Sequence, residues 1–282
     1  MFVGDTHQAI YGFRGADVDA MDNLSGALAA AQLPLSVSYR CPRKVIELAQ
    51  KIVPQILPRA DAPDGVIDSV TDQQFLSKVT PGDMVLCRLN APLVKPAFEL
   101  IRRGVKAIIR GREIGSGLVN LIKRVQKRNK VEDSDLTSLI KCLGEYVDAQ
   151  VHRLRIAHKE NQAMILEDQL LTIFAMSDGA RRISDLVTRI GTIFSDDVQG
   201  VVFSSIHKAK GLEAQRVFVV APETIPFARA TKDWQIAQEL NLAYVCVTRA
   251  MEELHFVGDI PAIFSDTLQD VPSPEEDVSR RY

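Results

Sequence analysis

The sequence is short of the features that mark a membrane, secreted or metal-binding protein. No apolar run reaches the roughly 18 residues of a membrane-spanning helix, and the N-terminus has no basic segment followed by an apolar one. The four cysteines lie far apart without paired spacing, which argues against a zinc site and favours free thiols in a reducing compartment. We therefore expect a cytoplasmic protein with no disulfides and no membrane contact.

An excess of charge is also lacking. The formal net charge is −2, so the chain as a whole has no electrostatic preference for a polyanion, and any nucleic-acid site must be a local patch. A length of 282 residues, of which 46% are hydrophobic and 25% charged, is typical of one large or two modest globular domains.

Strand and helix patterns alternate along most of the chain. Apolar runs predict strands, and apolar residues at helical spacing predict helices. The expected strands are 2–5, 35–38, 82–88, 105–109, 200–206, 216–221 and 253–257, and the expected helices are 17–31, 43–57, 92–103 and 233–250. This alternation predicts an α/β fold with a parallel sheet.

Residues 114–194 depart from that alternation, because their pattern is almost wholly helical with only short breaks. Their charged faces include the stretch KRVQKRNKVEDSD, for which a solvated helix face is the ordinary explanation. The segment therefore predicts a helical subdomain inserted into the α/β fold.

The first stretch that suggests chemistry is VGDTHQAIYGFRGAD, residues 3–17. A glutamine just beyond a strand, here Gln8, can hydrogen-bond a phosphate oxygen or an attacking water. Tyr11 and Phe13 lie on a glycine-containing turn, where aromatic faces can stack on the bases of a single-stranded nucleic acid. The alternative is that both rings are core residues beside a structural Arg14.

Two further stretches place an arginine at the end of an element. In LSVSYRCP, residues 35–42, Tyr39 and Arg40 suit a purine nucleotide, because a ring can stack on the base while a guanidinium reaches the phosphates. The alternative is a tyrosine packed in the sheet beside a solvated arginine. In LAYVCVTRAMEELHFVG, residues 242–258, Arg249 is either a charge-stabilising arginine or a cation at a helix C-terminus.

The remaining stretch is SSIHKAKGLEAQRVFVV, residues 204–220, in which a strand leads into a turn and then a second strand. Hydroxyl and lysine side chains at a strand end can hold phosphodiester oxygens, and Glu213 can accept a hydrogen bond from a ribose hydroxyl. Taken alone, a histidine or lysine in such a loop is usually just solvated.

In this order, the four stretches resemble the third, fourth, fifth and sixth motifs of the UvrD and Rep family of superfamily 1 DNA helicases. The resemblance covers most of the chain and implies a RecA-like parallel-sheet domain with an inserted helical subdomain. It also implies a role for each matching residue. Gln8 would sense the γ-phosphate, Tyr11 and Phe13 would stack on single-stranded DNA with Arg14 linking the two tasks, Tyr39 would stack on adenine, Arg40 and Arg249 would be arginine fingers, Glu213 would bind the ribose, and Ser205, His207 and Lys210 would face the DNA.

The chain departs from the family in one important respect. The phosphate-cradling pattern G-x-x-x-x-G-K followed by Ser or Thr does not occur, and neither does the acidic magnesium motif. The helical insertion is also shorter than the family's accessory subdomain. We therefore expect residues 1–34 to be the remnant of a first RecA-like domain, 35–113 and 196–270 the two parts of a second one, 114–195 the helical insertion, and 271–282 a tail.

The resemblance implies the C-terminal part of an ATP-dependent 3′→5′ DNA helicase or translocase, which we expect to be inactive without the upstream ATPase domain. Its cofactors would be ATP and Mg²⁺, with the magnesium ligands in that missing domain. Its partners would be single-stranded DNA and the missing N-terminal half or an equivalent protein. The alternative is a non-catalytic single-stranded DNA-binding or regulatory protein derived from a helicase.

Overall fold

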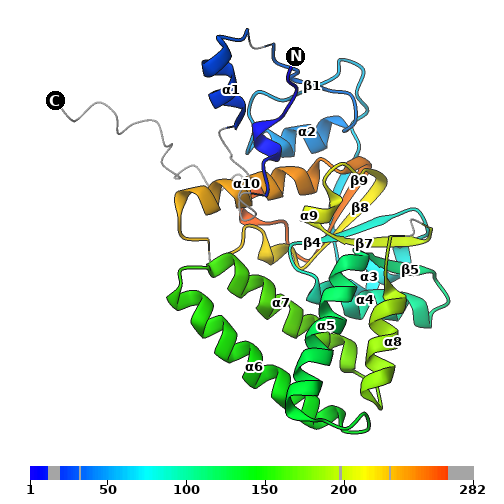
Figure 1. Cartoon of the computed structure of the whole chain (residues 1–282). Helices are drawn as coiled ribbons and strands as arrows, with labels where there is room; N and C mark the ends of the chain where they lie inside the picture. Colours follow the sequence, from blue (N-terminus) through cyan, green and yellow to red (C-terminus); the bar gives the residue numbers. More distant parts are fainter. Residues whose placement is uncertain (12–19, 32, 197–198, 229, 266–282) are drawn as a thin grey trace.

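A parallel sheet with helices on both faces organises the chain (Figure 1). The computed structural model describes residues 1–11, 20–31, 33–196, 199–228 and 230–265. Across the main sheet of these residues the strands are β3 (Val66–Val70), β9 (Ala250–Val257), β8 (Ala214–Val220), β4 (Met84–Cys87), β7 (Val201–Ser205), β5 (Ala107–Arg110) and β6 (Phe194–Ser195). Every neighbouring pair is parallel, which confirms the expected α/β class.

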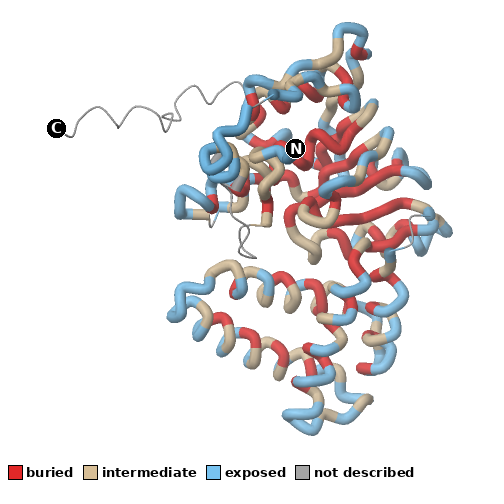
Figure 2. The backbone as a smooth tube through the Cα atoms, turned by 45° about the horizontal axis from the view of Figure 1, so that its top comes forward, coloured by how far each residue is buried: buried red, intermediate tan, exposed pale blue. Residues whose placement is uncertain are grey.

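The central strand β4 shows why the sheet is covered on both faces. All four of its residues are buried, and successive side chains point to opposite sides of a strand. Val85 and Cys87 belong to one apolar core, whereas Met84 and Leu86 belong to the other. Figure 2 shows the buried residues concentrated along the sheet and on the helix faces that pack against it.

Two groups of helices supply those cores. One core includes residues of α3 (Asp72–Lys78), α4 (Ala91–Arg102), α5 (Arg112–Asn129), α6 (Leu136–Ile156), α7 (Glu160–Ser177) and α8 (Ile183–Ile193). The other includes residues of α2 (Arg43–Ala49), α9 (Ile206–Ala209) and α10 (Asp233–Val247). The remaining elements are α1 (Ala20–Leu28), the paired strands β1 (Val37–Ser38) and β2 (Leu57–Pro58), and the short 3₁₀ turns η1 (Thr6–Gln8), η3 (Pro222–Thr224) and η4 (Ala262–Phe264). Within the described residues, no helix combines the length and the apolar composition needed to cross a bilayer.

Three local predictions differ from the structure. Residues 2–5 form no strand among the described residues, and Phe2 and Val3 are 61% and 73% exposed. The helix expected over 43–57 ends at Ala49, shortly before Pro54, whose ring cannot continue a helix. The elements β3 and α3 were not predicted, although Thr71 and Gln74 form a capping box at the start of α3.

The helices α5 to α8, which we call the helical block, follow one another between β5 and β6. Asp168 of α7 joins this block to the α/β part of the chain. Its side chain is buried at the start of α4, the helix that follows β4. It accepts hydrogen bonds from the backbone nitrogens of Asn90 at 3.0 Å and Ala91 at 3.1 Å, and from Asn90 Nδ2 at 2.7 Å. The first N–H groups of a helix have no carbonyl partner within the helix. At the N-terminus of α4, a side chain of the helical block accepts hydrogen bonds from these groups.

Replacing Asp168 should therefore destabilise the protein more than an ordinary surface carboxylate would. We expect Asp168→Ala to lower the free energy of unfolding by about 2–4 kcal/mol, because buried donors lose a charged acceptor. Urea denaturation measures the effect. The matched control is Asp135→Ala, which removes an exposed cap that accepts from the backbone nitrogen of Ser138 at 3.0 Å at the start of α6. An equal loss for the two variants would show that Asp168 is only a local cap.

Candidate nucleotide and nucleic-acid site

The last of the four stretches centres on Arg249, between the end of α10 and the start of β9. Its side chain is 1% exposed. Nε donates to the Val245 carbonyl at 3.0 Å, Nη1 to the Leu212 carbonyl at 3.0 Å, and Nη2 to Thr248 Oγ1 at 3.1 Å. These acceptors are all neutral, and among the described residues no carboxylate forms an ion pair with Arg249. A buried guanidinium in these surroundings is suited to an anionic ligand.

Burial lowers the pKa of Arg249, and the positive charge of Arg40 lowers it further. Arg40 follows β1 and forms an ion pair with Glu213, with both side chains partly exposed. Exposed pairs of this kind contribute little to stability, so Arg40 can exchange Glu213 for another anion at low cost. Beside it, Tyr39 is 78% exposed, which leaves its ring free to stack.

The second and fourth stretches also touch through Cys41, whose Sγ lies 3.5 Å from the Thr248 carbonyl. Burial raises the pKa of the Cys41 thiol, so this thiol is poorly suited to act as a nucleophile. All four cysteines of the chain are free thiols. Among the described residues, no group of three or more histidine, cysteine, aspartate or glutamate side chains is arranged to hold a metal ion.

The first stretch is held against α10 through η1. Asn241 of α10 donates from Nδ2 to the carbonyls of Thr6 and Ala9, each at 3.2 Å. The Gln8 side chain donates to Asp5 Oδ2 at 2.8 Å, and its backbone carbonyl accepts from Lys210 Nζ at 2.8 Å. Gln8 and Lys210 are therefore neighbours although they are 202 residues apart.

Tyr11 joins the same group. Its hydroxyl donates to the carbonyl of His207 at 2.7 Å, and its ring lies 5.7 Å from Lys210 Nζ and 6.4 Å from the His207 ring. Tyr11 also packs against the core that includes α10. This contact is the one expected if Tyr11 is a core residue, the alternative to stacking on a base. Phe13 and Arg14 lie outside the described residues.

Ser205 is placed differently from its neighbours. It is the last residue of β7 and is buried, so its hydroxyl is not presented on the surface, whereas Lys210 is exposed. Between them, Lys208 forms an ion pair with Glu113 at the start of α5. The loop after β7 is thereby tied to the helical block.

Two contact groups result. Gln8, Tyr11, His207 and Lys210 form one, and Arg40, Glu213 and Arg249 with the exposed Tyr39 form the other. The segment after β7 runs through both, since it carries His207 and Lys210 as well as Glu213. The roles expected for these residues stay predictions, but the structure brings the four stretches together.

Sequence reasoning missed several polar residues that position these groups. Asn241 is one, and a second case is Arg88, directly after β4, whose Nη2 donates to Glu239 Oε1 of α10 at 2.6 Å. Glu239 also accepts from the backbone nitrogen of Phe227 at 3.0 Å. A charged residue directly after an apolar strand, as in GDMVLCR, is the signal that could have pointed to Arg88.

Comparisons with known proteins identify the family of the chain. Residues 112–258 match the model of the UvrD-like helicase C-terminal domain. The chain is 24% identical over 302 aligned positions to F-box DNA helicase protein 1 of Schizosaccharomyces pombe, covering 94% of this chain and 31% of that protein. It is 26% identical over 299 positions to the ATP-dependent DNA helicase UvrD2 of Mycobacterium tuberculosis, covering 89% of this chain and 42% of that protein. The chain thus spans less than half the length of these relatives.

Among solved structures, the C-terminal domain of a possible DNA helicase from Lactobacillus plantarum WCFS1 is similar, with 14% sequence identity and a TM-score of 0.36. The match covers 81% of this chain and 92% of that one. The family match carries more weight, because it extends over just over half of the 282 residues, from the start of the helical block to the end of the sheet. The chain belongs to the UvrD-like helicase C-terminal domain family.

Proposed function

We propose that this chain is the C-terminal part of an ATP-dependent DNA helicase or translocase that moves 3′→5′ along single-stranded DNA. The observation that carries the proposal is the buried Arg249, which has only neutral acceptors and lies beside the exchangeable Arg40. The names of the relatives in Schizosaccharomyces pombe and Mycobacterium tuberculosis support it, since both are DNA helicases.

The residues at this site fit a nucleoside triphosphate. Tyr39 offers an exposed ring for the adenine, Glu213 a carboxylate for the ribose hydroxyls, and Arg40 and Arg249 two guanidinium groups for the terminal phosphate. Bound with Mg²⁺, ATP supplies the free energy for movement. Arg40 and Arg249 stabilise the negative charge that develops on the transferred phosphoryl group, and Gln8 senses the γ-phosphate.

The phosphate-cradling loop and the magnesium ligands come from a separate ATPase region, because this sequence lacks both motifs. Exposure of large apolar side chains to water is unfavourable, so a group of them indicates where that region docks. Phe2, Val3, Leu33 and Leu35 are all exposed, and they lie in the segments that flank η1 and β1. We propose that the ATPase region covers them.

A short mechanical path connects the two contact groups. Asn241 in the second half of α10 holds η1, and Arg249 lies two residues beyond the last residue of that helix, Val247. A shift of Arg249 toward the nucleotide therefore moves η1, and with it Gln8 and Tyr11. In this way closure around the nucleotide displaces Tyr11, His207 and Lys210, which we propose contact the DNA together with Phe13.

The second candidate function is a non-catalytic single-stranded DNA-binding or regulatory protein derived from a helicase. The absence of a phosphate-cradling pattern from the 282 residues favours it. In that case the DNA contacts remain important, whereas the two arginines have no catalytic role.

The arginines can be tested in the enzyme formed by this chain and the ATPase region that carries the phosphate-cradling motif. We expect Arg40→Ala to lower kcat for ATP hydrolysis by about 10³-fold or more, because an arginine finger is lost. The matched control is Arg43→Ala, three residues further along the chain. It breaks an exposed ion pair in which Arg43 Nε lies 3.6 Å from Asp64 Oδ1. Steady-state ATPase assays measure both variants. Turnover of Arg40→Ala equal to that of the control would remove Arg40 from the site, whereas no turnover by the unmodified enzyme would favour the non-catalytic candidate.

The predicted stacking of Phe13 can be tested on the chain alone. Phe13→Ala should weaken the binding of a fluorescent single-stranded oligonucleotide by about 1–3 kcal/mol, the usual contribution of one stacked base. Its melting temperature should stay at the unmodified value. Trp234→Ala, which removes a partly exposed aromatic ring outside the four stretches, serves as the control. A lower melting temperature with unchanged DNA affinity would instead identify Phe13 as a core residue.

A further inference from the structure

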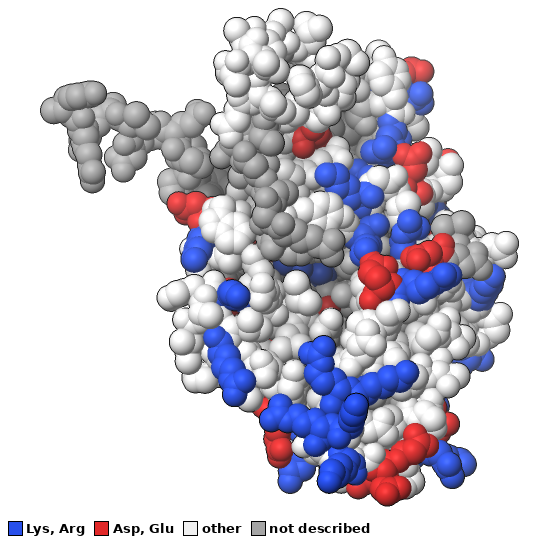
Figure 3. All heavy atoms as spheres, in the orientation of Figure 1, with Lys and Arg blue, Asp and Glu red and all other residues white. Residues whose placement is uncertain are grey.

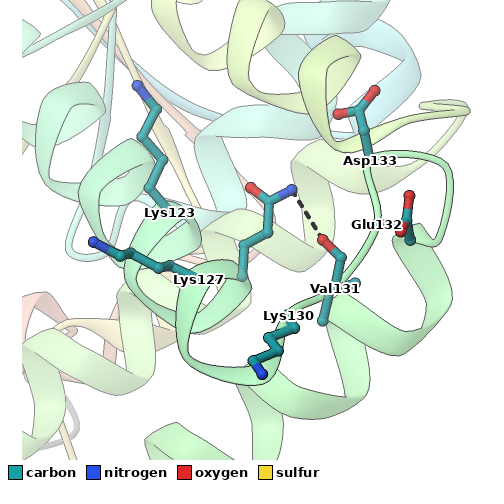
Figure 4. Close-up of a pocket in the computed structure, with 7 residues that line it drawn as sticks. Lys123, Lys127, Lys130, Val131, Glu132 and Asp133 are labelled. Carbon is teal, nitrogen blue, oxygen red and sulfur yellow. Dashed lines mark hydrogen bonds between the residues drawn. The ribbon is translucent and has the colours of Figure 1, made fainter.

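Positive charge in this molecule is either exposed to water or buried. Figure 3 shows a large group of lysine and arginine side chains over the lower part of the molecule, where Figure 1 places α5 and α6. In Figure 4, Lys123 and Lys127 extend from α5 beside a concavity of about 460 Å³. Flexible side chains of this kind can take many directions in water. Arg249 is buried, so the residues around it determine where its guanidinium points.

The guanidinium of Arg249 has three acceptors, and only one of them is a side chain. Nε and Nη1 donate to the backbone carbonyls of Val245 and Leu212, both at 3.0 Å. Nη2 donates to Thr248 Oγ1 at 3.1 Å. Since a guanidinium carries five N–H groups, one N–H on Nη1 and one on Nη2 remain without a partner among the residues that the structure describes. These two N–H groups are the ones that an anionic ligand can use.

The hydroxyl of Thr248 is itself held in one direction. Thr248 is 4% exposed, and its Oγ1 donates to the carbonyl of Tyr244, four residues earlier, at 2.8 Å, with the Val245 carbonyl at 3.3 Å. The single proton of the hydroxyl is used in this way, so its lone pairs are available to Arg249. Donation to a carbonyl also polarises the hydroxyl and makes it a better acceptor. Thr248 therefore offers Arg249 a fixed and neutral acceptor.

A threonine that bonds the carbonyl four residues earlier is common in helices and by itself has no functional meaning. Thr172 of α7 is an ordinary case, because it is buried and its Oγ1 donates to the carbonyl of Asp168 at 2.6 Å. Within the described part of the chain, no arginine donates to Thr172. Thr248 differs because its oxygen also accepts from a buried guanidinium.

The backbone of Thr248 contacts the segment that carries the other arginine. Its carbonyl lies 3.5 Å from Cys41 Sγ, and Cys41 directly follows Arg40. Burial raises the pKa of the Cys41 thiol, so the thiol keeps the proton that it donates to this carbonyl. Thr248 thus contacts Arg249 through its side chain and the segment of Arg40 through its backbone.

We propose that Thr248 is a positioning residue for Arg249, whose hydroxyl directs the two remaining N–H groups toward the terminal phosphate of the nucleotide. The inference rests on the proposed function, in which the nucleotide binds beside Arg40 and Arg249. A neutral acceptor suits this task, because it orients the guanidinium and leaves its charge for the phosphoryl group. A carboxylate in the same place would form an ion pair with Arg249 and neutralise it.

Thr248→Val tests the proposal, because valine keeps the shape of threonine and removes only the hydroxyl. In the enzyme formed by this chain and the ATPase region, we expect kcat for ATP hydrolysis to fall by about 10- to 10²-fold with a smaller change in KM, as for a catalytic group displaced by about 1 Å. Thr248→Ser keeps the hydroxyl and should restore most of kcat. The matched control is Thr172→Val, which removes a buried hydroxyl with the same kind of bond to a carbonyl and should not change kcat.

A double variant distinguishes positioning from an independent effect. Arg249→Met fills the buried position without any donor. In this background, Thr248→Val should change kcat by less than about twofold, because the hydroxyl has no guanidinium left to direct. If the losses of the two single variants multiply, or if Thr248→Val hydrolyses ATP as fast as Thr172→Val while Arg249→Met is slow, the positioning role is overturned. If Arg249→Met is as fast as the unmodified enzyme, or if the unmodified enzyme shows no turnover, the proposed function is overturned and this inference with it.

Urea denaturation of the 282-residue chain gives a measurement that needs no ATP. Thr248→Val leaves an N–H group of the buried Arg249 without a partner, so it should lower the urea midpoint more than Thr172→Val does. In the Arg249→Met background the two valine variants should lower it equally. Equal shifts in the unmodified background would overturn the proposal, because Thr248 would then not hold Arg249. If Thr248→Val does not fold, Thr248→Ser is compared with Thr248→Ala, since these two variants differ by one oxygen atom, and equal kcat for them would overturn the proposal.

Discussion

The burial of one guanidinium holds the candidate site together. Arg249 can be buried only because carbonyls of two separate segments accept its protons, one in α10 and one just before β8. A buried charge without such acceptors would strongly destabilise the fold. The need to satisfy Arg249 therefore brings the end of α10, the start of β9 and the segment before β8 to one place, and Arg40 reaches that place through Glu213.

The order of the strands explains why one segment reaches both contact groups. β7 and β8 lie on either side of β4, so the chain from Ile206 to Glu213 must cross that strand on one face of the sheet. This crossing begins with α9, which is buried in the core shared with α10. His207 and Lys210 lie along the crossing and Glu213 lies at its end. A short connection thereby spans the distance between residues that we propose touch DNA and residues that we propose touch the nucleotide.

The sequence was most informative where structure is decided locally. Stretches such as GDMVLCR and GVVFSSI predicted buried parallel strands because their apolar runs need no knowledge of a partner. β3 was missed because it lies at the sheet edge and carries Asp68, which contacts His255 on the neighbouring strand β9. The strand predicted at 2–5 was wrong for the converse reason: Phe2 and Val3 are apolar, but a strand also needs a neighbour with which to pair. The resemblance supplied the residues that we propose contact the ligands. Asn241, Asp168 and the Arg88–Glu239 pair act over long sequence separations that no local pattern reveals.

The position of the helical block has a consequence for how such proteins can vary. The block leaves the sheet after β5 and returns at β6, and these two strands are paired with each other, Arg110 lying opposite Ser195. The ends of the excursion are therefore adjacent whatever lies between them, and the entropy of closing a connection grows only slowly with its length. The sheet and the contact group of Arg40, Glu213 and Arg249 thus form a constant frame, and the helical block is a segment that can be exchanged. A longer, shorter or unrelated module could be grafted between the same two strands without altering the strand order, provided that it supplies a carboxylate for the start of α4.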